Sequence, residues 1–285
     1  MRRMPCAPCM AALAFWALAL PASGEEKPEG AEKPLWEIGL GVGAVSFPDY
    51  RGSSRQRTVG LPVPYFVYRG KTLQADRGGL RGKIFDSDRV KLNLSLSASL
   101  PVKSNSKGAR RDMPDLQPTA ELGPSLAIGL WRGKTHKARL DLRLPVRAAY
   151  TIRGGVRYAG LIFSPALNLN LDPFGHSGWN LGALGGPVFA NARQHNYFYD
   201  VAPRYARPGR PAYSASGGYS GAQFLVSLSK RFEDFWVGGF ARHDNLHGAA
   251  FDDSPLVERK HAWAGGLSMI WIFGKSSRPA VSGGD

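Results

Sequence analysis

Charged residues recur at every second position in one segment of the chain. Arg139, Asp141, Arg143 and Arg147 share one face of residues 138–150 if this segment is a β-strand, because successive side chains of a strand point to opposite faces. A row of guanidinium groups attracts anions. The pattern therefore fits a lumen that prefers anionic solutes, or else a narrow interior that these charges fill by pairing with one another.

A partner for this row lies in the preceding segment. If residues 132–136 form a short turn that sets Trp131 opposite Lys137, the numbers of facing residues in the two antiparallel strands sum to about 268. This register places Glu121 opposite Arg147. We predict an ion pair between these two side chains, with a carboxylate–guanidinium distance within about 4 Å.

The strand pattern is clearest in residues 90–102, which read Val-Lys-Leu-Asn-Leu-Ser-Leu-Ser-Ala-Ser-Leu-Pro-Val. Apolar residues take every second position, and Lys91 and Asn93 belong to the other face. At roughly 3.3 Å per residue the segment is about 43 Å long, which crosses a hydrocarbon core when tilted by about 45°. We expect a membrane strand whose apolar face meets lipid and whose Lys91 and Asn93 line the interior.

The same period recurs along most of the chain, and no apolar run after residue 24 is long enough for a membrane helix. This predicts an all-β fold, a single-chain transmembrane antiparallel β-barrel. Bacterial barrels of this kind have an even number of strands. About twelve are expected if residues 71–85 form two short strands hinged at Gly78-Gly79, and ten is the alternative.

Loop lengths predict which end of the barrel faces which side. Long loops of such barrels lie outside the cell and short turns lie in the periplasm. The segments expected outside are 103–117, 191–218 and 246–260, and those expected inside are 132–136, 172–177 and 232–234.

Arginines are frequent in or beside the predicted outer loops. Because a guanidinium group matches phosphate through two parallel hydrogen bonds, they are candidates for binding lipopolysaccharide. Ordinary solvated loop charge is the alternative. The residues concerned are Arg110, Arg111, Arg204, Arg207 and Arg210.

The chain begins like a secreted precursor. A basic start, an apolar stretch at residues 11–20 and small residues before Glu25 are typical of a signal peptide. We expect the protein in the outer membrane of a Gram-negative bacterium, surrounded by outer-membrane lipid. The predicted parts are a signal peptide (1–24), a disordered periplasmic lead-in (25–34), the barrel (35–273) and a flexible tail (274–285).

The formal net charge is +15, and the only two cysteines, Cys6 and Cys9, lie in the predicted signal. The mature chain would then have neither disulfides nor thiolate metal ligands. Nucleic acid is not expected as a partner despite the positive charge, because the signal sends the chain out of the cytoplasm.

We expect no catalytic residues, no metal and no cofactor. His243 and His247 would lie about 13 Å apart on a strand, too far to share a metal ion. Arg242-His243-Asp244 is the only hint of a lipid-modifying enzyme. Aromatic residues near strand ends are expected in the interfacial belts of the membrane: Trp36, Trp131, Tyr150, Tyr158, Trp179, Trp236 and Trp271.

Short motifs occur in a fixed order along residues 36–273. They are Pro48-Asp49-Tyr50-Arg51-Gly52-Ser53, Pro64-Tyr65-Phe66-Val67-Tyr68-Arg69-Gly70, Gly82-Lys83-Ile84-Phe85-Asp86-Ser87-Asp88-Arg89, Met113-Pro114-Asp115-Leu116, Tyr197-Phe198-Tyr199-Asp200-Val201, Arg210-Pro211-Ala212-Tyr213, Gly217-Gly218-Tyr219-Ser220-Gly221 and Ser254-Pro255-Leu256-Val257. Together they resemble the MipA/OmpV family of Gram-negative outer-membrane proteins.

The resemblance implies an outer-membrane barrel and suggests a function. One member of the family is named for binding a murein lytic transglycosylase, and is thought to scaffold it with a penicillin-binding protein. Other members look like porins or surface antigens. The resemblance transfers no catalytic residues. It therefore favours a non-enzymatic scaffold for peptidoglycan-remodelling enzymes, with a porin for small anionic solutes as the alternative and a lipid-modifying enzyme as a third reading.

Overall fold

The computed structural model describes most of the chain from Pro34 to Arg278. The predicted signal peptide, residues 25–33 of the lead-in and residues 279–285 of the tail lie outside the described residues. No helix among the described residues is long and apolar enough to cross a membrane. The described ranges are 34–69, 73–76, 79–82, 85–86, 89–104, 108–133, 138–174 and 178–278.

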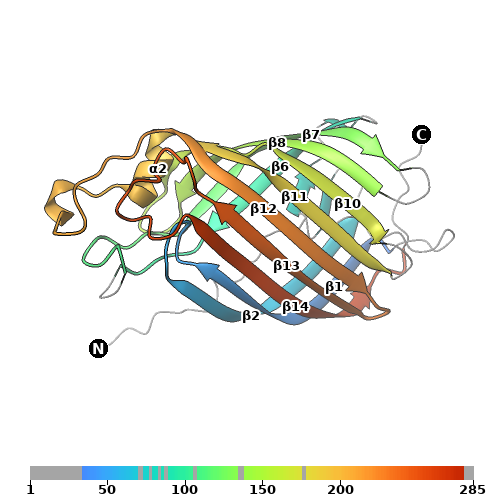
Figure 1. Cartoon of the computed structure of the whole chain (residues 1–285). Helices are drawn as coiled ribbons and strands as arrows, with labels where there is room; N and C mark the ends of the chain where they lie inside the picture. The colour runs from blue at the N-terminus through green and yellow to red at the C-terminus, as the bar shows by residue number, and fades with distance from the viewer. Residues whose placement is uncertain are drawn as a thin grey trace, which may run out of the picture.

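One antiparallel sheet makes up the body of the molecule and curls into a barrel (Figure 1). Its first strands are β1 (Trp36–Pro48), β2 (Gln56–Arg69), β3 (Leu73–Asp76), β4 (Gly79–Gly82), β5 (Phe85–Asp86), β6 (Val90–Ser99) and β7 (Thr119–Arg132). The later strands are β8 (Ala138–Thr151), β9 (Arg157–Phe163), β10 (Ala166–Phe174), β11 (Trp179–Ala190), β12 (Gly218–Arg231), β13 (Phe235–Asn245) and β14 (His261–Lys275).

The ladder of strands follows the chain around the barrel. The first strand, β1, pairs with both β2 and the last strand, β14. β4 pairs with β3 and lies beside β6, and β5, which follows β4 directly in the chain, pairs with β6. β9 and β10 are also two pieces of one path, since both pair with β8 and with β11.

Joining these interrupted pieces leaves twelve strands among the described residues, the number that the sequence favours. The predicted division of residues 71–85 is confirmed, because β3 and β4 form a hairpin in which Asp76 faces Gly79. The last strand runs to Lys275, two residues beyond the predicted end of the barrel.

Apolar side chains cover most of the outer face. Val42 of β1 is 71 % exposed and Leu267 of β14 is 74 % exposed, as expected for side chains that meet lipid. The alternating apolar residues of β2 face the interior instead. Val63, Tyr65 and Val67 are buried in the interior, and the residues between them face outward. Alternation in the sequence separates two faces, but it does not say which of them meets lipid.

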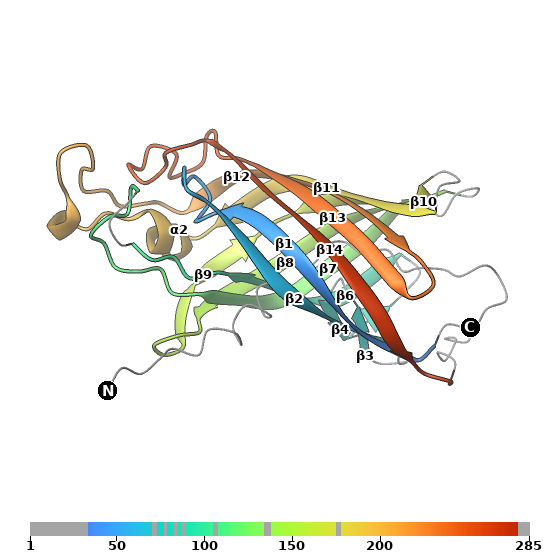
Figure 2. The same cartoon turned by 90° about the horizontal axis from the view of Figure 1, so that it is seen from below.

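The three long loops gather at one end of the barrel, opposite the short β12–β13 turn (Figures 1 and 2). They pack together with the β1–β2 turn around a shared apolar core that includes Tyr199, Leu246, Phe251 and Leu256. We call this assembly the loop dome. It consists of residues 49–55, 100–104, 108–118, 191–217 and 246–260.

Two features of the loop dome differ from the sequence prediction. The strand predicted over residues 90–102 ends at Ser99, and Val102 instead pairs with Leu116 inside the dome. The dome also contains a helix, α2 (Ala192–Tyr199), which begins where the Asn191 side chain accepts a hydrogen bond from the backbone of Gln194.

Candidate functional site

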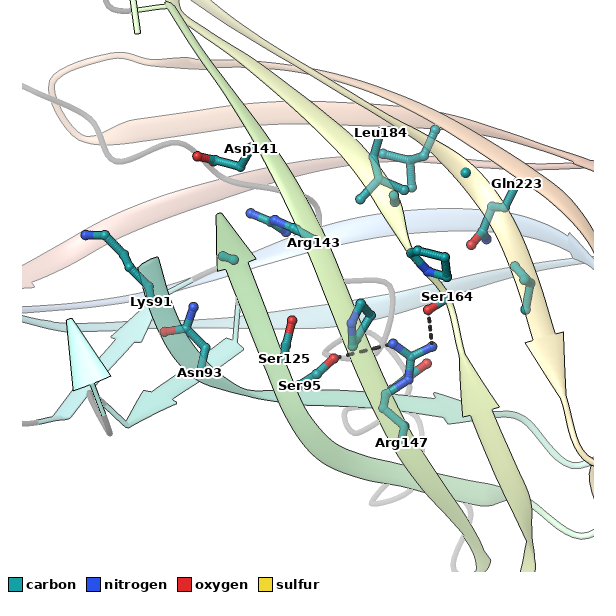
Figure 3. Close-up of a pocket in the computed structure, with 18 of the residues that line it drawn as sticks. Lys91, Asn93, Ser95, Ser125, Asp141, Arg143, Arg147, Ser164, Leu184 and Gln223 are labelled. Atoms are coloured by element: carbon teal, nitrogen blue, oxygen red, sulfur yellow. Dashed lines mark hydrogen bonds between the residues drawn. The ribbon is translucent and has the colours of Figure 1, made fainter. Parts of the chain in front are cut away.

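A polar cavity of about 300 Å³ lies inside the barrel. Figure 3 shows how neighbouring strands contribute its lining: Lys91 and Asn93 come from β6, Ser125 from β7, and Asp141 and Arg143 from β8. We call the inner surface of β6, β7 and β8 the arginine wall. Six of the seven residues that the sequence places in the interior line this cavity: Lys91, Asn93, Arg139, Asp141, Arg143 and Arg147. The seventh, Glu121, lines the adjoining cavity described below.

Basic side chains dominate this cavity. Its lining includes Arg139, Arg143 and Arg147, which are spaced four residues apart on β8, and one acidic side chain, Asp141. Arg139 pairs with Asp141 at 2.8 Å. Residues four apart on a strand are separated by about 13 Å, so the three arginines form a ladder along much of the membrane-spanning length.

The predicted ion pair between Glu121 and Arg147 is present. The Arg147 Nε atom lies 3.1 Å from Glu121 Oε2, and its other nitrogens donate to Ser95 and Ser164 (Figure 3). The predicted register was wrong by two residues, because Glu121 faces Ala149. A slip of two residues keeps each side chain on the same face, and the long arginine side chain spans the resulting diagonal.

The opposite side of the barrel is filled by apolar side chains. Val63, Tyr65, Trp236, Ile270 and Ile272 form a buried cluster on the inner face of β2, β13 and β14. We call the inner surface of β13, β14, β1 and β2 the packed wall. Trp236 was predicted in an interfacial belt, but it points inward, and the exposed face of β13 carries Phe235 instead.

A buried ion pair joins the packed wall to β12. Glu37 is 3 % exposed, and both of its oxygens accept hydrogen bonds from Arg231, at 2.9 and 3.1 Å. The Tyr65 hydroxyl also donates to Glu37, at 2.9 Å. Such a bidentate, fully bonded pair holds its two side chains in one geometry.

Two of the five loop arginines are structural. Arg110 and Arg210 are 7 % and 4 % exposed, so their guanidinium groups cannot reach a lipid phosphate. Arg110 donates to the carbonyl oxygens of Phe198 and Pro114, and Arg210 donates to that of Ala109 at 2.8 Å. They cross-link loops of the dome, which corrects their prediction as lipopolysaccharide ligands.

The other three loop arginines lie nearer the surface. Arg111 and Arg204 are exposed, and Arg207 is half-buried. Asp112 pairs with both Arg111 and Arg207, each at 3.3 Å. These positions leave the lipopolysaccharide hypothesis open for Arg111, Arg204 and Arg207.

A second cavity, of about 260 Å³, lies between the loop dome and the barrel. We call it the dome chamber. It adjoins the first cavity, since Arg147, Ser164 and Gln223 line both. Its wall on the dome side includes the neighbours Gln194 and His195 of α2.

His195 fastens α2 to β12. Its Nδ1 lies 2.6 Å from the carbonyl oxygen of Ser216, so this nitrogen carries the proton and donates, and the Ser220 hydroxyl donates to Nε2 at 2.5 Å. Burial lowers the pKa of His195, the Ser216 carbonyl opposes this effect, and the nearby positive charge of Arg51 adds to it. The neutral ring is therefore the form that fits the folded dome.

Sequence reasoning missed the residues that converge on the chamber from distant loops. Asp244, which is fully buried, pairs with Arg51 at 2.9 Å and with Arg242 at 3.0 Å. Arg51 lies in the β1–β2 turn, so nothing in local spacing connects it to Asp244. Within Arg242-His243-Asp244, only the two flanking residues face inward. His243 points outward and stacks on His261, so it lies on the other face from Arg242 and Asp244.

In the described part of the chain, no group of three or more His, Cys, Asp or Glu side chains is placed so that it could hold a metal ion.

Comparisons with known proteins identify a family. The family model described as MltA-interacting protein MipA matches residues 40–273. No curated protein matches the chain.

Several solved structures are similar in fold. An outer membrane channel from Pseudomonas putida F1 is 12 % identical, with 87 % of this chain and 100 % of that chain covered and a TM-score of 0.44. The NanC porin is 8 % identical, with 82 % and 98 % covered and a TM-score of 0.36. The outer membrane protein OprG from Pseudomonas aeruginosa is 11 % identical, with 85 % and 95 % covered and a TM-score of 0.22.

The family match spans the strands from β1 to β14, and these strands present an apolar outer face around an interior that holds a polar cavity. The chain is therefore an outer-membrane β-barrel that belongs to the family of the MltA-interacting protein MipA.

Proposed function

We propose that this barrel is a non-enzymatic outer-membrane scaffold for a peptidoglycan-remodelling enzyme. Membership of a family described by its interaction with MltA is the observation that carries this proposal. By analogy, a murein lytic transglycosylase is the proposed first partner and a penicillin-binding protein the second. The barrel itself takes no catalytic part in this function.

The short-turn end of the barrel is the proposed docking face, because it would face the periplasm. Its strand ends are tied together: Lys275 pairs with Asp234 at 2.7 Å, and the backbone of Leu35 bonds to that of Arg278 at 2.9 Å. Strand ends that are already tied together lose less entropy when a partner binds.

Co-purification tests the scaffold proposal. The tagged barrel in mild detergent should retain a purified lytic transglycosylase of the MltA type, and Lys275→Glu at the short-turn end should weaken retention. The matched control, Arg111→Glu on the loop dome, should leave retention unchanged. No retention by the wild-type barrel, or equal losses in both variants, would refute docking at this face.

Passage of small anionic solutes is the second proposed function, and the arginine ladder of the lumen supports it. Rings and rows of fixed positive charge favour anions in a pore. In planar bilayers, the barrel should give conductance steps and a reversal potential that shows preference for chloride over potassium. A barrel that inserts but gives no steps would exclude this function.

Binding of lipopolysaccharide phosphates by Arg111, Arg204 and Arg207 is proposed as a property of the dome surface. It would orient the barrel in its membrane and is compatible with either function.

A further inference from the structure

Arginines outnumber carboxylates in the lining of the dome chamber. The charged residues described there are Arg51, Arg147 and Arg242 against Asp49 and Glu121. Asp244, which is fully buried, pairs with both Arg51 and Arg242. The lining thus offers guanidinium groups that can bind an anion through charge-assisted hydrogen bonds.

Two polar atoms in the chamber wall have no hydrogen-bond partner. Arg51 is held on Asp244 through Nε, but its Nη2 atom is buried and unpartnered. Gln194 is 7 % exposed, and its Oε1 atom is also buried and unpartnered. Buried polar atoms are nearly always satisfied in folded proteins. Here a donor and an acceptor are both left over in the wall of one cavity.

The position of Gln194 is fixed by its surroundings. The helix α2 lies directly on Gly160 of β9, where an added Cβ would come within 2.7 Å of the Gln194 Cα. His195, the next residue, is anchored on both ring nitrogens. A shift of the helix α2 therefore cannot bring the Gln194 Oε1 atom to a hydrogen-bond donor.

We propose that the dome chamber binds a small carboxylate that also carries hydroxyl groups, a sugar acid by chemical class. The carboxylate accepts from Arg51 Nη2, and a hydroxyl donates to Gln194 Oε1. A cavity of about 260 Å³ limits the ligand to about the size of one sugar ring. The inference deepens the proposed passage of anionic solutes, although binding in the chamber does not require a continuous pore.

Calorimetry on the full barrel in detergent or nanodiscs tests the proposal with D-glucuronate as the probe. D-glucose has the hydroxyl groups without the charge, and acetate has the charge without the hydroxyl groups. We expect glucuronate to bind at least roughly tenfold more tightly than either, because it alone satisfies both wall atoms. Equal affinity for glucuronate and acetate, or no affinity for glucuronate, would overturn the proposal.

Two variants locate the binding site. Gln194→Leu removes the acceptor, and it should weaken glucuronate binding roughly fivefold without affecting acetate. Arg51→Lys keeps the charge beside Asp244 but removes Nη2, and it should weaken binding roughly tenfold. Gln117→Leu, on the dome but outside the chamber, is the matched control and should bind as the wild type does. Glucuronate binding that Gln194→Leu and Gln117→Leu leave equally intact would place the ligand elsewhere.

Folding and conductance must be measured on the same preparations. Migration of the unheated protein as a folded barrel on a gel shows whether each variant has assembled. Conductance without glucuronate binding would overturn the chamber proposal alone. Glucuronate binding without conductance would overturn solute passage and leave the chamber proposal standing.

Discussion

The packed wall and the arginine wall are built from strands with the same two-residue period, yet they fill the interior in different ways. On β2, Val63 and Tyr65 face inward and pack against Trp236. On β8, Arg143 and Arg147 face inward and line a cavity. One side of the barrel thus resembles the core of a soluble protein, and the other resembles the wall of a channel.

This difference shows where close packing stabilises the barrel and where a polar cavity remains. Close packing and a buried, fully bonded ion pair make the packed wall intolerant of change. The arginine wall faces a cavity, so its side chains can change without displacing neighbours. We expect substitutions of the same type to have unequal effects on the two walls.

Glycine substitution should give the largest difference. An added Cβ at Gly41 in the packed wall would overlap the backbone carbonyl oxygen of Met269, which cannot move without breaking the β1–β14 ladder. Gly41→Ala should cost about 3 kcal/mol or more of stability and prevent most of the protein from assembling. At Gly129 in the arginine wall the nearest atom to an added Cβ is 3.7 Å away.

Urea titration of the folded gel species measures this pair of variants. Gly129→Ala should unfold within about 1 kcal/mol of the wild type. If Gly41→Ala assembles as well as Gly129→Ala, these two sites do not differ in packing. The comparison is between two sites and not between whole walls, because an added Cβ at Gly123 of β7 would also overlap a backbone oxygen, that of Val146.

Arginine removal should give the next largest difference. Arg231→Met would leave the buried Glu37 carboxylate without its bidentate partner, at a cost of about 3–5 kcal/mol. Arg139→Met removes the partner of Asp141, but both side chains line the polar cavity and are 38 % and 12 % exposed, so the loss should be smaller than for Arg231→Met. The same urea titration compares them, and equal losses would contradict a distinction between structural and luminal arginines.

The sequence predicts features that depend on the two-residue period and on loop length. The period gave the barrel, the division of residues 71–85, and the ion pair of Glu121 with Arg147, which a two-residue error in register did not disturb. Loop length correctly grouped the long loops at one end.

The sequence could not predict features that depend on contacts between distant segments. The two-residue period does not say which face of β2 meets lipid. The inward face is the one that packs against Trp236 of β13 and Ile270 of β14. The burial of Arg110 is decided by Phe198 in another loop. Likewise the ion pair of Arg51 with Asp244 depends on the pairing of the first strand, β1, with the last strand, β14.

Charge removal from the arginine ladder should change selectivity without changing stability. Arg143→Ser should reduce the preference for chloride over potassium roughly twofold, because one fixed charge of the ladder is lost. Reversal potentials across a salt gradient measure this preference. Arg111→Ser on the dome is the matched control, and a similar reduction in that variant would assign the selectivity to the dome and not to the arginine wall.

Acidification should affect the loop dome and spare both walls, and this effect should be the smallest. The side chains that line the two walls include no histidine, whereas His195 holds α2 in the dome. Its pKa is lowered by burial, so the unfolded dome binds the proton more readily than the folded dome does. Stability that is fully present above the ordinary histidine pKa of about 6.5 is then lost as the pH falls below it.

Proteolysis of the dome loops in reconstituted vesicles should be faster at about pH 5 than at about pH 7.5, with the barrel itself resistant at both values. His195→Gln cannot gain a proton, so its cleavage rate should no longer change with pH. Equal acceleration in that variant would show that the pH response arises elsewhere in the dome.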